Sequence, residues 1–470
     1  MPDYEPHVAG EWRGTDGTIE VRDLADGGTV ATVGTADGPL VEEALATADG
    51  ARAALRETTV PERVGWLRGI AEGIQARREA LAEAIVREGG KTITRARGEV
   101  DAAIERFDLA IDEARSLRGD YRDGITAGHE GWSAMRVPEP VGVVVCITPF
   151  NYPLATPALR IAPALAAGNA VLLKPASDTP VTTALLTEAI VEAGVPDAAF
   201  HYLPGRAGEI GDALVGDERV NAIAMTGSSA AGKRIAATSG MAELHLELGG
   251  NAPAIVFPDA DLQLAGREIA TGALKGAGQR CSAVSRVLAV GGVHDDLVAA
   301  IDEAMGEWVE GDLFDEATDC SPLIDERAAD RVEALIEDAV DRGADLVRGG
   351  GRDGTYVQRT VLASVPHDAR LQTEEQFGPV APVFRVADES EALALANGTD
   401  LALDGAVFTS DYDRAHRVAR AIDAGGVRIN GAPSHGNADV PYGGNRSSGI
   451  GREGIGTTID AFVRTKSIVL

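Results

Sequence analysis

Cysteine is scarce in this chain of 470 residues, and the three present, Cys146, Cys281 and Cys320, lie far apart. Such spacing makes a poor disulfide framework, and without a Cys-x-x-Cys pair no zinc or other metal site is expected. Cys146 lies in the apolar run Val143–Ile147 and is expected to be a buried strand residue. Cys320 follows Asp319 in an acidic loop, where a thiolate is disfavoured. Cys281 is therefore the candidate reactive thiol.

Long hydrophobic runs are also missing. No stretch reaches the ~18 consecutive apolar residues that a membrane-spanning helix needs. The first 14 residues include acids and lack the basic and then apolar pattern of a secretory signal. We therefore expect a cytoplasmic protein with no membrane partner. The chain is too long for one ordinary hydrophobic core, so two or three packed units are expected.

Positive charge is the third shortage. The chain has five lysines, and 43 Lys and Arg against 73 Asp and Glu give a net charge of −30. A general nucleic-acid binder needs a basic surface to displace phosphate counterions, so that class is excluded. An acidic surface that repels some substrates is one interpretation. Because the acids are spread over expected helix faces, we favour a solvated shell that keeps the protein soluble in high salt, typical of a halophilic source.

The pattern of apolar residues divides the chain into a helical region and two series of alternating strands and helices. Residues 38–117 have apolar positions at three- and four-residue intervals, typical of amphipathic helices. Residues 119–137 have the composition of a hairpin. The runs that follow suit buried parallel strands. They are Val141–Ile147, Ala170–Leu173, Ala199–Leu203, Val220–Met225 and Leu244–Leu248, then Pro253–Phe257, Val284–Val290, Thr360–Val365, Val380–Val386, Gly405–Thr409 and Gly426–Asn430.

This alternation predicts an α/β fold with parallel sheets and ligands at the carboxyl ends of their strands. A helix is expected to begin at Pro180, with Thr179 as its N-cap. No low-complexity linker separates the two series, so their boundary near residue 249 is expected to be a packed interface.

Cys281 ends the motif Gly-Gln-Arg-Cys, between a helical segment and an expected strand. A cysteine in such a turn can be exposed, and the neighbouring Arg280 would lower its pKa and raise its nucleophilicity. A lone cysteine in a turn is more often inert, so this motif alone is modest evidence.

Two further motifs follow expected strands. Glu247 begins Glu-Leu-Gly-Gly at the carboxyl end of a strand and is a candidate general base, although a glutamate that only caps a loop is the simpler alternative. Asn151 lies in Pro-Phe-Asn-Tyr-Pro, where two prolines fix the backbone, so its amide can be aimed as an oxyanion hole requires. Together with a nucleophilic thiol, these groups suit covalent acyl chemistry.

Seven motifs, in order and spread over nearly the whole chain, resemble the aldehyde dehydrogenase superfamily. They are Pro-Phe-Asn-Tyr-Pro (149–153), Leu-Lys-Pro-Ala-Ser (173–177), Met-Thr-Gly-Ser (225–228), Glu-Leu-Gly-Gly (247–250), Gly-Gln-Arg-Cys (278–281), Glu-Glu-Gln-Phe-Gly-Pro-Val (374–380) and Pro-Tyr-Gly-Gly (441–444) with Ser-Gly (448–449). The resemblance implies that superfamily's fold. It has a Rossmann-like NAD(P)-binding domain (1–118 and 138–248), an α/β catalytic domain (249–446) and small β oligomerisation segments (119–137 and 447–470).

The resemblance also implies the reaction, oxidation of an aldehyde to a carboxylic acid. Cys281 would attack the aldehyde carbon, and the Asn151 amide with the Cys281 N–H would hold the oxyanion. Loss of a hydride to the nicotinamide would leave a thioester, for which Glu247 would activate water. Family members that release a coenzyme A thioester typically lack this glutamate, so an acid product is expected.

The cofactor, NADP or NAD, is likewise implied by the resemblance. The expected binding residues are Thr148, Phe150, Lys174, Ser177, Gly227, Ser228, Leu248, Gly249, Glu375 and Phe377. Lys174 and Glu375 match positions that hold the two riboses, and Gly227 precedes a helix N-terminus suited to the pyrophosphate. NAD-specific members tend to carry glutamate where this chain has Ser177, so NADP should be accepted.

Within the superfamily the chain is most similar to the non-phosphorylating glyceraldehyde-3-phosphate dehydrogenases and related lactaldehyde dehydrogenases. The former bind the substrate's phosphate and hydroxyl with a tyrosine and arginines, which Tyr152 and Arg280 match, and Ser282 completes the expected substrate site. His435 stands where that group carries an arginine, and a histidine supplies a weaker, pH-dependent charge. Small anionic or hydroxylated aldehydes therefore all stay open as substrates.

Assembly into a homodimer or homotetramer is also implied. Residues 119–137 and the terminal strand Thr465–Leu470 have no obvious partner in either strand series, so we expect the tail to add to a neighbouring subunit's sheet. The simpler alternative is that it caps its own domain.

Two other functions were weighed. Residues 227–233 are close to the phosphate loop G-x-x-x-x-G-K-[ST], but Arg234 stands where a nucleotide triphosphatase needs a hydroxyl for Mg²⁺. The other is a non-catalytic structural relative, which would be expected to have lost the nucleophile or the base.

Overall fold

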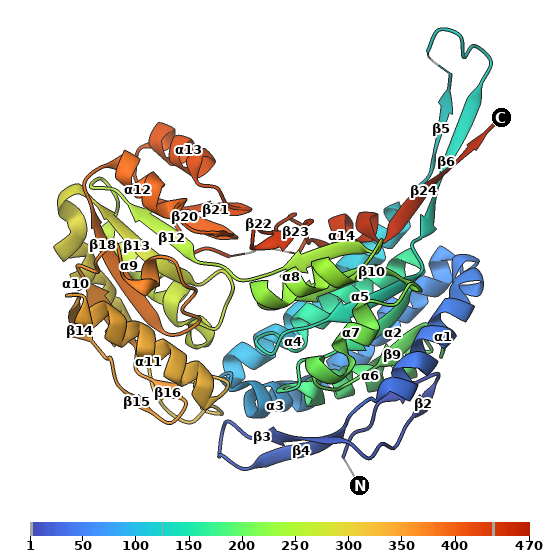
Figure 1. The fold of residues 1–470 in the computed structure, drawn as a ribbon, viewed down its shortest axis with the longest axis horizontal. Coiled ribbons are helices and arrows are strands. Elements are labelled where there is room, and N and C mark those ends of the chain that lie inside the picture. The colour runs from blue at the N-terminus through green and yellow to red at the C-terminus, as the bar shows by residue number, and fades with distance from the viewer. Residues whose placement is uncertain (1–2, 125, 435–437) are drawn as a thin grey trace.

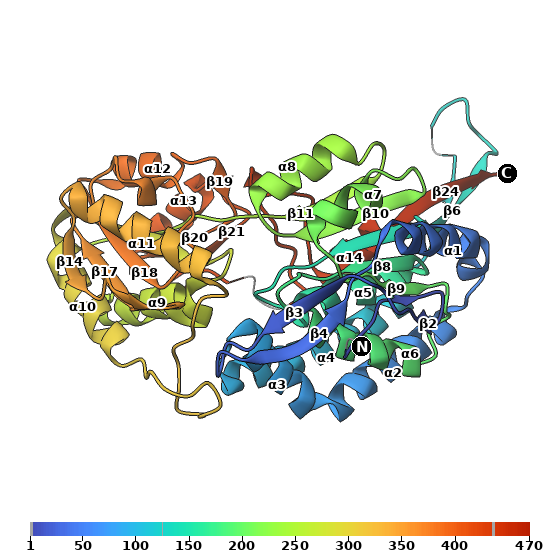
Figure 2. The ribbon, with the colours of Figure 1, turned by 60° about the horizontal axis from the view of Figure 1, so that its bottom comes forward.

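The computed structural model describes residues 3–124, 126–434 and 438–470. Two α/β units lie side by side, and an arm projects from the one that holds the N-terminus (Figure 1, Figure 2). Within these ranges, no helix is both long enough and apolar enough to cross a bilayer.

The first unit is built on an eight-stranded sheet in the order β2-β1-β9-β8-β7-β10-β11-β23. Its parallel centre is β7 (Val143–Ile147), β8 (Ala170–Lys174), β9 (Phe200–Tyr202), β10 (Val220–Thr226) and β11 (Glu243–Glu247), and its edges are β1 (His7–Val8), β2 (Glu11–Trp12) and β23 (Gly449–Ile450). The chain runs outward from β7 through β8 to β9, and then from β10 to β11 on the other side. The strand order therefore reverses between β7 and β10, and such a reversal opens a ligand crevice at the carboxyl ends.

Helices cover both faces of this sheet. They are α1 (Gly38–Arg56), α2 (Val60–Ala76), α3 (Arg78–Gly89), α4 (Ile93–Ser116), α5 (Ala155–Ala167), α6 (Pro180–Glu192), α7 (Asp212–Val215), α8 (Ser229–Thr238) and α14 (Ile455–Ala461), with a π-turn at Ala207–Gly211. The expected helical region 38–117 thus forms four helices. One break is set by a capping box of Thr59 and Glu62, and another by Gly90, which takes a left-handed φ of 67°.

The start of α6 differs from the expectation. Thr179 is the N-cap residue, but its side chain accepts no hydrogen bond from the helix. The buried carboxylate of Glu88 on α3 accepts instead from the backbone N–H groups of Val181 and Thr182. The predicted capping role of Thr179 was therefore wrong, because a charged acceptor from a neighbouring helix occupies that place.

The second unit is a seven-stranded sheet in the order β14-β17-β18-β13-β12-β20-β21. Its strands are β12 (Ala252–Val256), β13 (Val284–Val290), β17 (Thr360–Ala363), β18 (Val380–Val386), β20 (Asp404–Phe408) and β21 (Gly426–Ile429), all parallel, with β14 (Asp345–Arg348) antiparallel at one edge. Its helices are α9 (Leu262–Leu274), α10 (His294–Gly306), α11 (Glu326–Asp341), α12 (Glu389–Ala396) and α13 (Tyr412–Ala421). The strands expected from the apolar runs are all confirmed, with bounds that differ by at most two residues.

Three short antiparallel pairs complete the two units. They are β3 (Thr18–Arg22) with β4 (Thr29–Gly34), β15 (Arg352–Asp353) with β16 (Tyr356–Val357), and β19 (Leu401–Ala402) with β22 (Asn445–Arg446).

The arm is an antiparallel sheet in the order β24-β6-β5, formed by β5 (Asp120–Asp123), β6 (Ser133–Pro140) and β24 (Val463–Val469). As expected, neither the hairpin nor the tail pairs with the strands of the two large sheets among the described residues, and β24 instead pairs with β6 along its whole length. The outer edge of β24 has no strand beside it in the described ranges. Residues 449–461 belong with the first unit, since β23 joins its sheet and α14 packs on α4 and α5.

Candidate active site

The carboxyl ends of the first sheet's parallel strands carry most of the residues singled out from the sequence. β8 ends at Lys174 and β11 ends at Glu247. Thr148 and Asn151 follow β7, and Gly227 follows β10, so the crevice at the order reversal lies between them. Alternating strands and helices thus place residues from distant parts of the chain at one edge of the sheet.

Cys281 is presented by the second unit, in the loop between α9 and β13. In the turn that precedes Cys281, the backbone takes left-handed φ values of 63° at Gly276, 54° at Ala277 and 71° at Gly278. A Cβ at Gly278 would lie 2.1 Å from the carbonyl oxygen of Gly378, so only glycine fits there. Ala277 holds this conformation with a side chain, a strained arrangement often found at functional sites.

The two units meet at this loop. The Asn151 side-chain amide donates to the carbonyl oxygen of Gln279 at 2.7 Å. On the other side, a Cβ at Gly250 would lie 2.0 Å from the Cys281 carbonyl oxygen, so the backbone after Glu247 touches the cysteine. Asn151, Cys281 and the Glu-Leu-Gly-Gly motif are therefore brought together. The Asn151 amide has a second hydrogen that the Gln279 bond does not use.

The environment of the Cys281 thiol differs from the expectation. Burial raises its pKa, the carboxylates of Asp404 and Glu247 raise it further, and Arg280 opposes them only in part. The guanidinium of Arg280 donates instead to Ser282 Oγ at 2.9 Å and to the Pro433 carbonyl at 3.2 Å. The expected low pKa of this thiol was therefore wrong, because burial and the two carboxylates outweigh the charge of Arg280.

Glu247 carries a buried carboxyl group that makes no hydrogen bond in the described ranges. It is 4% exposed, and neither of its oxygens has a hydrogen-bond partner among the described residues. Burial raises its pKa well above the usual range, and the nearby Glu453 carboxylate adds to the shift. A Cβ at Gly443 would lie 2.6 Å from Glu247 Oε1, so glycine there leaves the carboxyl its space.

Behind Glu247 lies an ion pair that the sequence analysis missed. Arg160 is fully buried on α5, where it pairs with Glu453 and donates to Thr226 Oγ1 at 2.6 Å. The Tyr442 hydroxyl donates to Glu453 Oε2 at 3.1 Å. A single arginine in the otherwise apolar helix of residues 155–167 was the available signal, because such a charge is not buried without a partner.

The residues expected at the cofactor line the same crevice. Lys174 is buried, which lowers its pKa to about 8, and its Nζ donates only to the Pro175 carbonyl in the described ranges. Glu375 Oε1 accepts from the Gly250 N–H at 2.9 Å, and burial raises the pKa of Glu375 to about 7. A buried amine and a buried carboxyl that lack strong partners suit ribose hydroxyls.

Phe150, Phe377 and Ser228, three more cofactor candidates, lie beside the carboxyl ends of β7 and β10. Phe377 holds a φ of 50°, and its ring meets that of Phe150 edge-on with centroids 6.0 Å apart. Ser228 is the N-cap of α8 and accepts from the Ala231 N–H, so the helix N-terminus points to the carboxyl end of β10. The donor set and the helix terminus fit a nicotinamide dinucleotide.

The same helix excludes the phosphate-loop alternative. Gly227 is followed at once by the N-cap, and residues 229–233 are already helical. A Cβ at Gly232 would lie 2.5 Å from Leu248, so that glycine serves helix packing. A loop long enough to wrap a triphosphate is therefore absent at residues 227–233.

Tyr152 lies within a group of cations. Burial would raise its pKa, but Arg280, Lys91 and Lys275 outweigh burial and lower it. The Nζ of Lys91 lies 3.8 Å above the centre of the tyrosine ring. Lys275 is half-buried, and burial together with the charges of Arg280 and Lys91 lowers its pKa. Sequence reasoning missed Lys91 and Lys275, although two of only five lysines meet here.

The other predicted residues have simpler outcomes. Ser282 is buried and bonded to Arg280, and His435 lies outside the described residues. Cys146 is buried, as expected, and Cys320 is buried as well; burial raises their thiol pKa values to about 12 and about 11, so a thiolate is disfavoured at Cys320 as expected. No cluster of three or more His, Cys, Asp or Glu side chains suited to a metal ion occurs in the described ranges.

Comparison with known proteins gives a consistent result. The sequence profile of the aldehyde dehydrogenase family matches residues 12–468. An NADP-dependent glyceraldehyde-3-phosphate dehydrogenase of Streptococcus equinus is 36% identical over 468 residues, 99% of this chain and 98% of its own. A 3-sulfolactaldehyde dehydrogenase of Priestia aryabhattai is 35% identical over 469 residues, with the same coverage of both chains. The crystal structure of NADP-dependent glyceraldehyde-3-phosphate dehydrogenase from Bacillus halodurans C-125, complexed with NADP, has a TM-score of 0.97 at 35% identity and 99% coverage of both chains.

Proposed function

This chain belongs to the aldehyde dehydrogenase family and is an NAD(P)-dependent aldehyde dehydrogenase, for which we propose a small anionic aldehyde as substrate and the carboxylic acid as product. The observation that carries the proposal is the meeting of Cys281, the Asn151 amide and the unpartnered Glu247 carboxyl between the two units. The test is the rate of reduced-cofactor formation with a panel of charged and neutral aldehydes.

The first half of the reaction is assigned to Cys281 and Asn151. The Cys281 sulfur attacks the aldehyde carbon, and the free hydrogen of the Asn151 amide, with the Cys281 backbone N–H, stabilises the oxyanion that forms. Because burial raises the pKa of the Cys281 thiol, the sulfur must lose its proton as it attacks, and in this scheme the proton passes to solvent water while Glu247 acts only in the second half of the reaction. When bound, the nicotinamide supplies the acceptor for the hydride that leaves the tetrahedral carbon.

The second half is hydrolysis of the thioester left on Cys281. A carboxyl with a raised pKa is a better base than an ordinary one, provided that it is ionised at the working pH. Glu247 would take a proton from water as the water attacks the thioester carbon, and the Cys281 thiol then leaves. Of the ion pair behind it, the Glu453 carboxylate disfavours the ionised form of Glu247, and the Arg160 charge offsets this effect only in part.

An anionic substrate is supported by the charges around Tyr152. Lys91, Lys275 and Arg280 gather on this ring in a chain whose net charge is −30. The names of similar proteins support the same class, since glyceraldehyde 3-phosphate and 3-sulfolactaldehyde both carry an anionic group. Tyr152 and Arg280 are proposed to contact that group, with Ser282 holding the arginine in place.

Lys275→Gln should raise KM for an anionic aldehyde at least about tenfold, because a hydrogen bond to a charged group contributes ~1.5–3 kcal/mol. KM for neutral glycolaldehyde should change little, and Lys275→Arg should restore most of the affinity for the anion. Initial-rate kinetics with succinate semialdehyde and glycolaldehyde test this. An equal rise in KM for both aldehydes would show that Lys275 shapes the site without recognising charge.

The use of NADP as well as NAD is proposed from the surroundings of Ser177. Its hydroxyl donates to the Gly205 carbonyl at 3.1 Å, and Arg206 follows directly. The site therefore offers a small neutral side chain and a nearby cation, which suit the 2′-phosphate of NADP.

Ser177→Glu should weaken NADP far more than NAD, by ~1–3 kcal/mol, because a carboxylate would face the 2′-phosphate. Ser177→Gln is the matched control, since it adds the same bulk without charge. Cofactor titrations by protein fluorescence give both dissociation constants. Equal losses for NAD and NADP in the Glu variant would place residue 177 away from the 2′-position.

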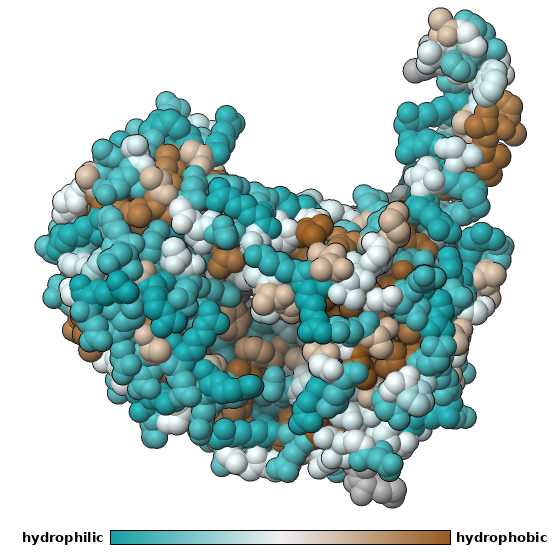
Figure 3. Space-filling view, in the orientation of Figure 1, coloured by the Kyte–Doolittle hydropathy of each residue, from teal (hydrophilic) through white to brown (hydrophobic). Residues whose placement is uncertain are grey.

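A homodimer or homotetramer is proposed from the arm. Figure 3 shows hydrophobic residues gathered on one side of the arm, where it projects from the body of the molecule. Trp132, Met135 and Val137 on the hairpin side and Ile468 and Val469 on β24 are exposed. An apolar strand with an open edge that projects from the body of a protein is suited to pairing with a second copy.

Truncation after Arg464 should therefore yield monomers with low activity, because it removes most of β24. Light scattering in high salt is the measurement, since screening there reduces repulsion between acidic subunits. Circular dichroism controls for folding. A truncated protein that keeps the mass of the intact oligomer would contradict the role of β24.

We also propose that the protein works at high salt concentration, because its net charge of −30 is typical of a halophilic source.

A further inference from the structure

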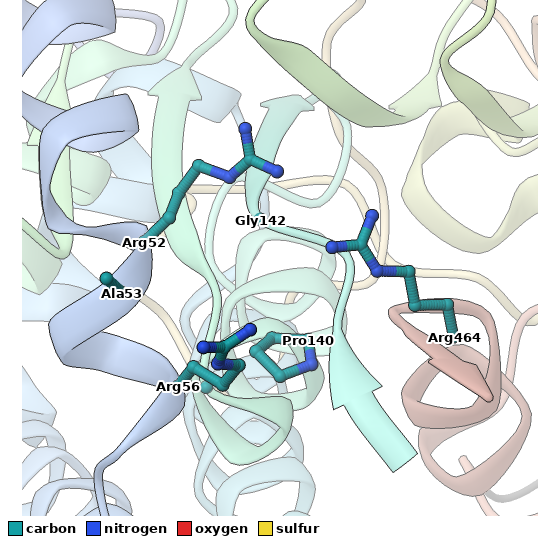
Figure 4. A pocket seen from close by; sticks show the side chains of 7 residues that line it. Arg52, Ala53, Arg56, Pro140, Gly142 and Arg464 are labelled. Atoms are coloured by element: carbon teal, nitrogen blue, oxygen red, sulfur yellow. The ribbon is translucent and has the colours of Figure 1, made fainter. Parts of the chain in front are cut away.

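A cavity of about 200 Å³ opens at the base of the arm, lined by three arginines. Arg52 and Arg56 project from the last turns of α1, and Arg464 projects from β24. Figure 4 shows their guanidinium groups approaching from different sides the space beside Pro140 and Gly142. The cavity therefore joins the body of the first unit to the arm.

This cavity is separate from the active site. Gly142 immediately precedes β7, and Gly168, also in the lining, ends α5 just before β8. The cavity thus lies at the amino ends of these two strands, whereas Lys174 and Asn151 lie at or beyond their carboxyl ends. Neither the aldehyde nor the nicotinamide cofactor is expected to reach it.

The charges of these arginines are only partly matched. The lining includes no acidic residue in the described ranges. Arg52 lies 3.0 Å from Asp49, and Arg56 lies 3.7 Å from Glu57 and 4.0 Å from Glu139, a carboxylate that Lys466 also binds. In the described ranges the Arg464 guanidinium forms no hydrogen bond or ion pair, although its charge helps to lower the pKa of Glu139. Positive charge is therefore in excess here, on a chain that is otherwise strongly acidic.

Two glycines of the lining take unusual backbone conformations, and a fourth arginine, Arg63, lies directly beside one of them, Gly168. Gly142 and Gly168 have φ values of 130° and 86°, which side-chain-bearing residues rarely adopt. A Cβ at Gly168 would lie 2.7 Å from an Nη of Arg63. Arg63 is 9% exposed, and its Nε has no hydrogen-bond partner among the described residues. A buried guanidinium with an unsatisfied donor needs an anion or an acceptor nearby.

A simpler explanation covers only part of this arrangement. Arginines in the last turn of a helix complement its dipole, which accounts for Arg56 and in part for Arg52. It does not account for Arg464, which comes from a strand of the arm, or for the buried Arg63.

We propose that this cavity binds a small anion with a phosphoryl group, at a site distinct from those of substrate and cofactor. Guanidinium groups bind phosphoryl oxygens through paired N–H donors. Three guanidinium groups that approach from two elements can surround a tetrahedral phosphoryl group better than a planar carboxylate. The volume is below the ~300–1,000 Å³ of sites for drug-sized ligands, so a phosphate monoester or phosphate itself fits. The bound anion bridges α1 and β24 and so holds the arm against the first unit.

Isothermal titration of the full-length protein with inorganic phosphate tests the site, at constant ionic strength and with NADP saturating. We expect one phosphate per subunit whose dissociation constant rises at least about tenfold in Arg464→Gln and in Arg56→Gln. Arg115→Gln is the matched control, because Arg115 ends α4, pairs with Asp112 at i,i+3 as Arg52 does with Asp49, and lies outside the cavity. It should leave the affinity unchanged.

Three results would overturn the proposal. The first is phosphate binding that is absent, or equal in the wild type and both cavity variants. The second is equal affinity for succinate, which would mean that the site does not select a phosphoryl group. The third is no phosphate binding together with dissociation of the oligomer in Arg464→Gln by light scattering, because the arginines would then hold carboxylates of a second subunit. These readouts do not depend on turnover, so they are independent of the proposed substrate.

Discussion

Cys281→Ala is expected to lower kcat/KM for aldehyde oxidation by at least about 10⁴-fold, because the covalent intermediate can no longer form. The loss should appear in kcat, whereas the dissociation constants of NAD and NADP should change little, since the Cys281 side chain is not among the residues proposed to bind the dinucleotide. Initial rates of reduced-cofactor formation and cofactor titrations by fluorescence separate these quantities.

Cys320→Ala is the matched control for this substitution. Cys320 is a buried thiol whose pKa is also raised, and Arg359 donates to its sulfur at 3.6 Å. Its replacement should leave kcat within a few-fold of the wild type. Substantial activity in Cys281→Ala, or an equal loss in Cys320→Ala, would show that the reaction does not pass through Cys281.

Glu247→Gln is expected to separate the two halves of the reaction. Steady-state turnover should fall by ~10²–10⁴-fold, the usual contribution of a general base, while a rapid burst of about one reduced cofactor per site persists. The reason is that thioester formation precedes the step for which Glu247 activates water. Stopped-flow absorbance of the reduced cofactor measures both phases, and Glu243→Gln, an exposed residue at the start of the same strand, is the control.

The raised pKa of Glu247 adds a dependence on pH. A base is active when ionised, and burial shifts its ionisation above the usual range of a carboxyl group. The steady-state rate of the wild type should therefore rise as pH increases toward neutrality and above, and Glu247→Gln should lack this rise. If the burst disappears together with turnover, Glu247 is needed earlier, to take the proton of the Cys281 thiol.

The strands and the catalytic triplet could be predicted from the sequence for separate physical reasons. Buried parallel strands are short, continuous apolar runs, so Val284–Val290 and Val380–Val386 have the bounds expected. Cys281, Glu247 and Asn151 each follow or precede such a strand within a short motif. Because the carboxyl ends of parallel strands share one edge, local patterns were enough to bring Asn151 and Glu247 together, whereas Cys281 reaches them from the loop before β13 of the second sheet.

Contacts between distant segments could not be predicted in this way. Lys91 and Lys275 meet at Tyr152 although no periodicity relates them. Glu88 takes the capping role expected of Thr179 because α3 packs beside the start of α6. The raised pKa of the Cys281 thiol depends on burial and on Asp404, more than a hundred residues away. In each case tertiary packing outweighs the effect of the neighbour in sequence.

The arm illustrates the same limit on a larger scale. The composition of residues 119–137 predicts a hairpin, and the terminal residues predict a strand. Their pairing with each other depends on both chain segments leaving the first unit at the same place, where Val463 lies opposite Pro140. No local pattern in either segment encodes that pairing.

The thioester on Cys281 can be tested most directly by mass spectrometry of Glu247→Gln after brief exposure to an aldehyde and NAD or NADP. We expect the intact protein to gain the mass of the acyl group, and digestion to locate the added mass on the peptide that contains Cys281. Formation of reduced cofactor without such an adduct, or an adduct on Cys146 or Cys320, would contradict covalent catalysis at Cys281.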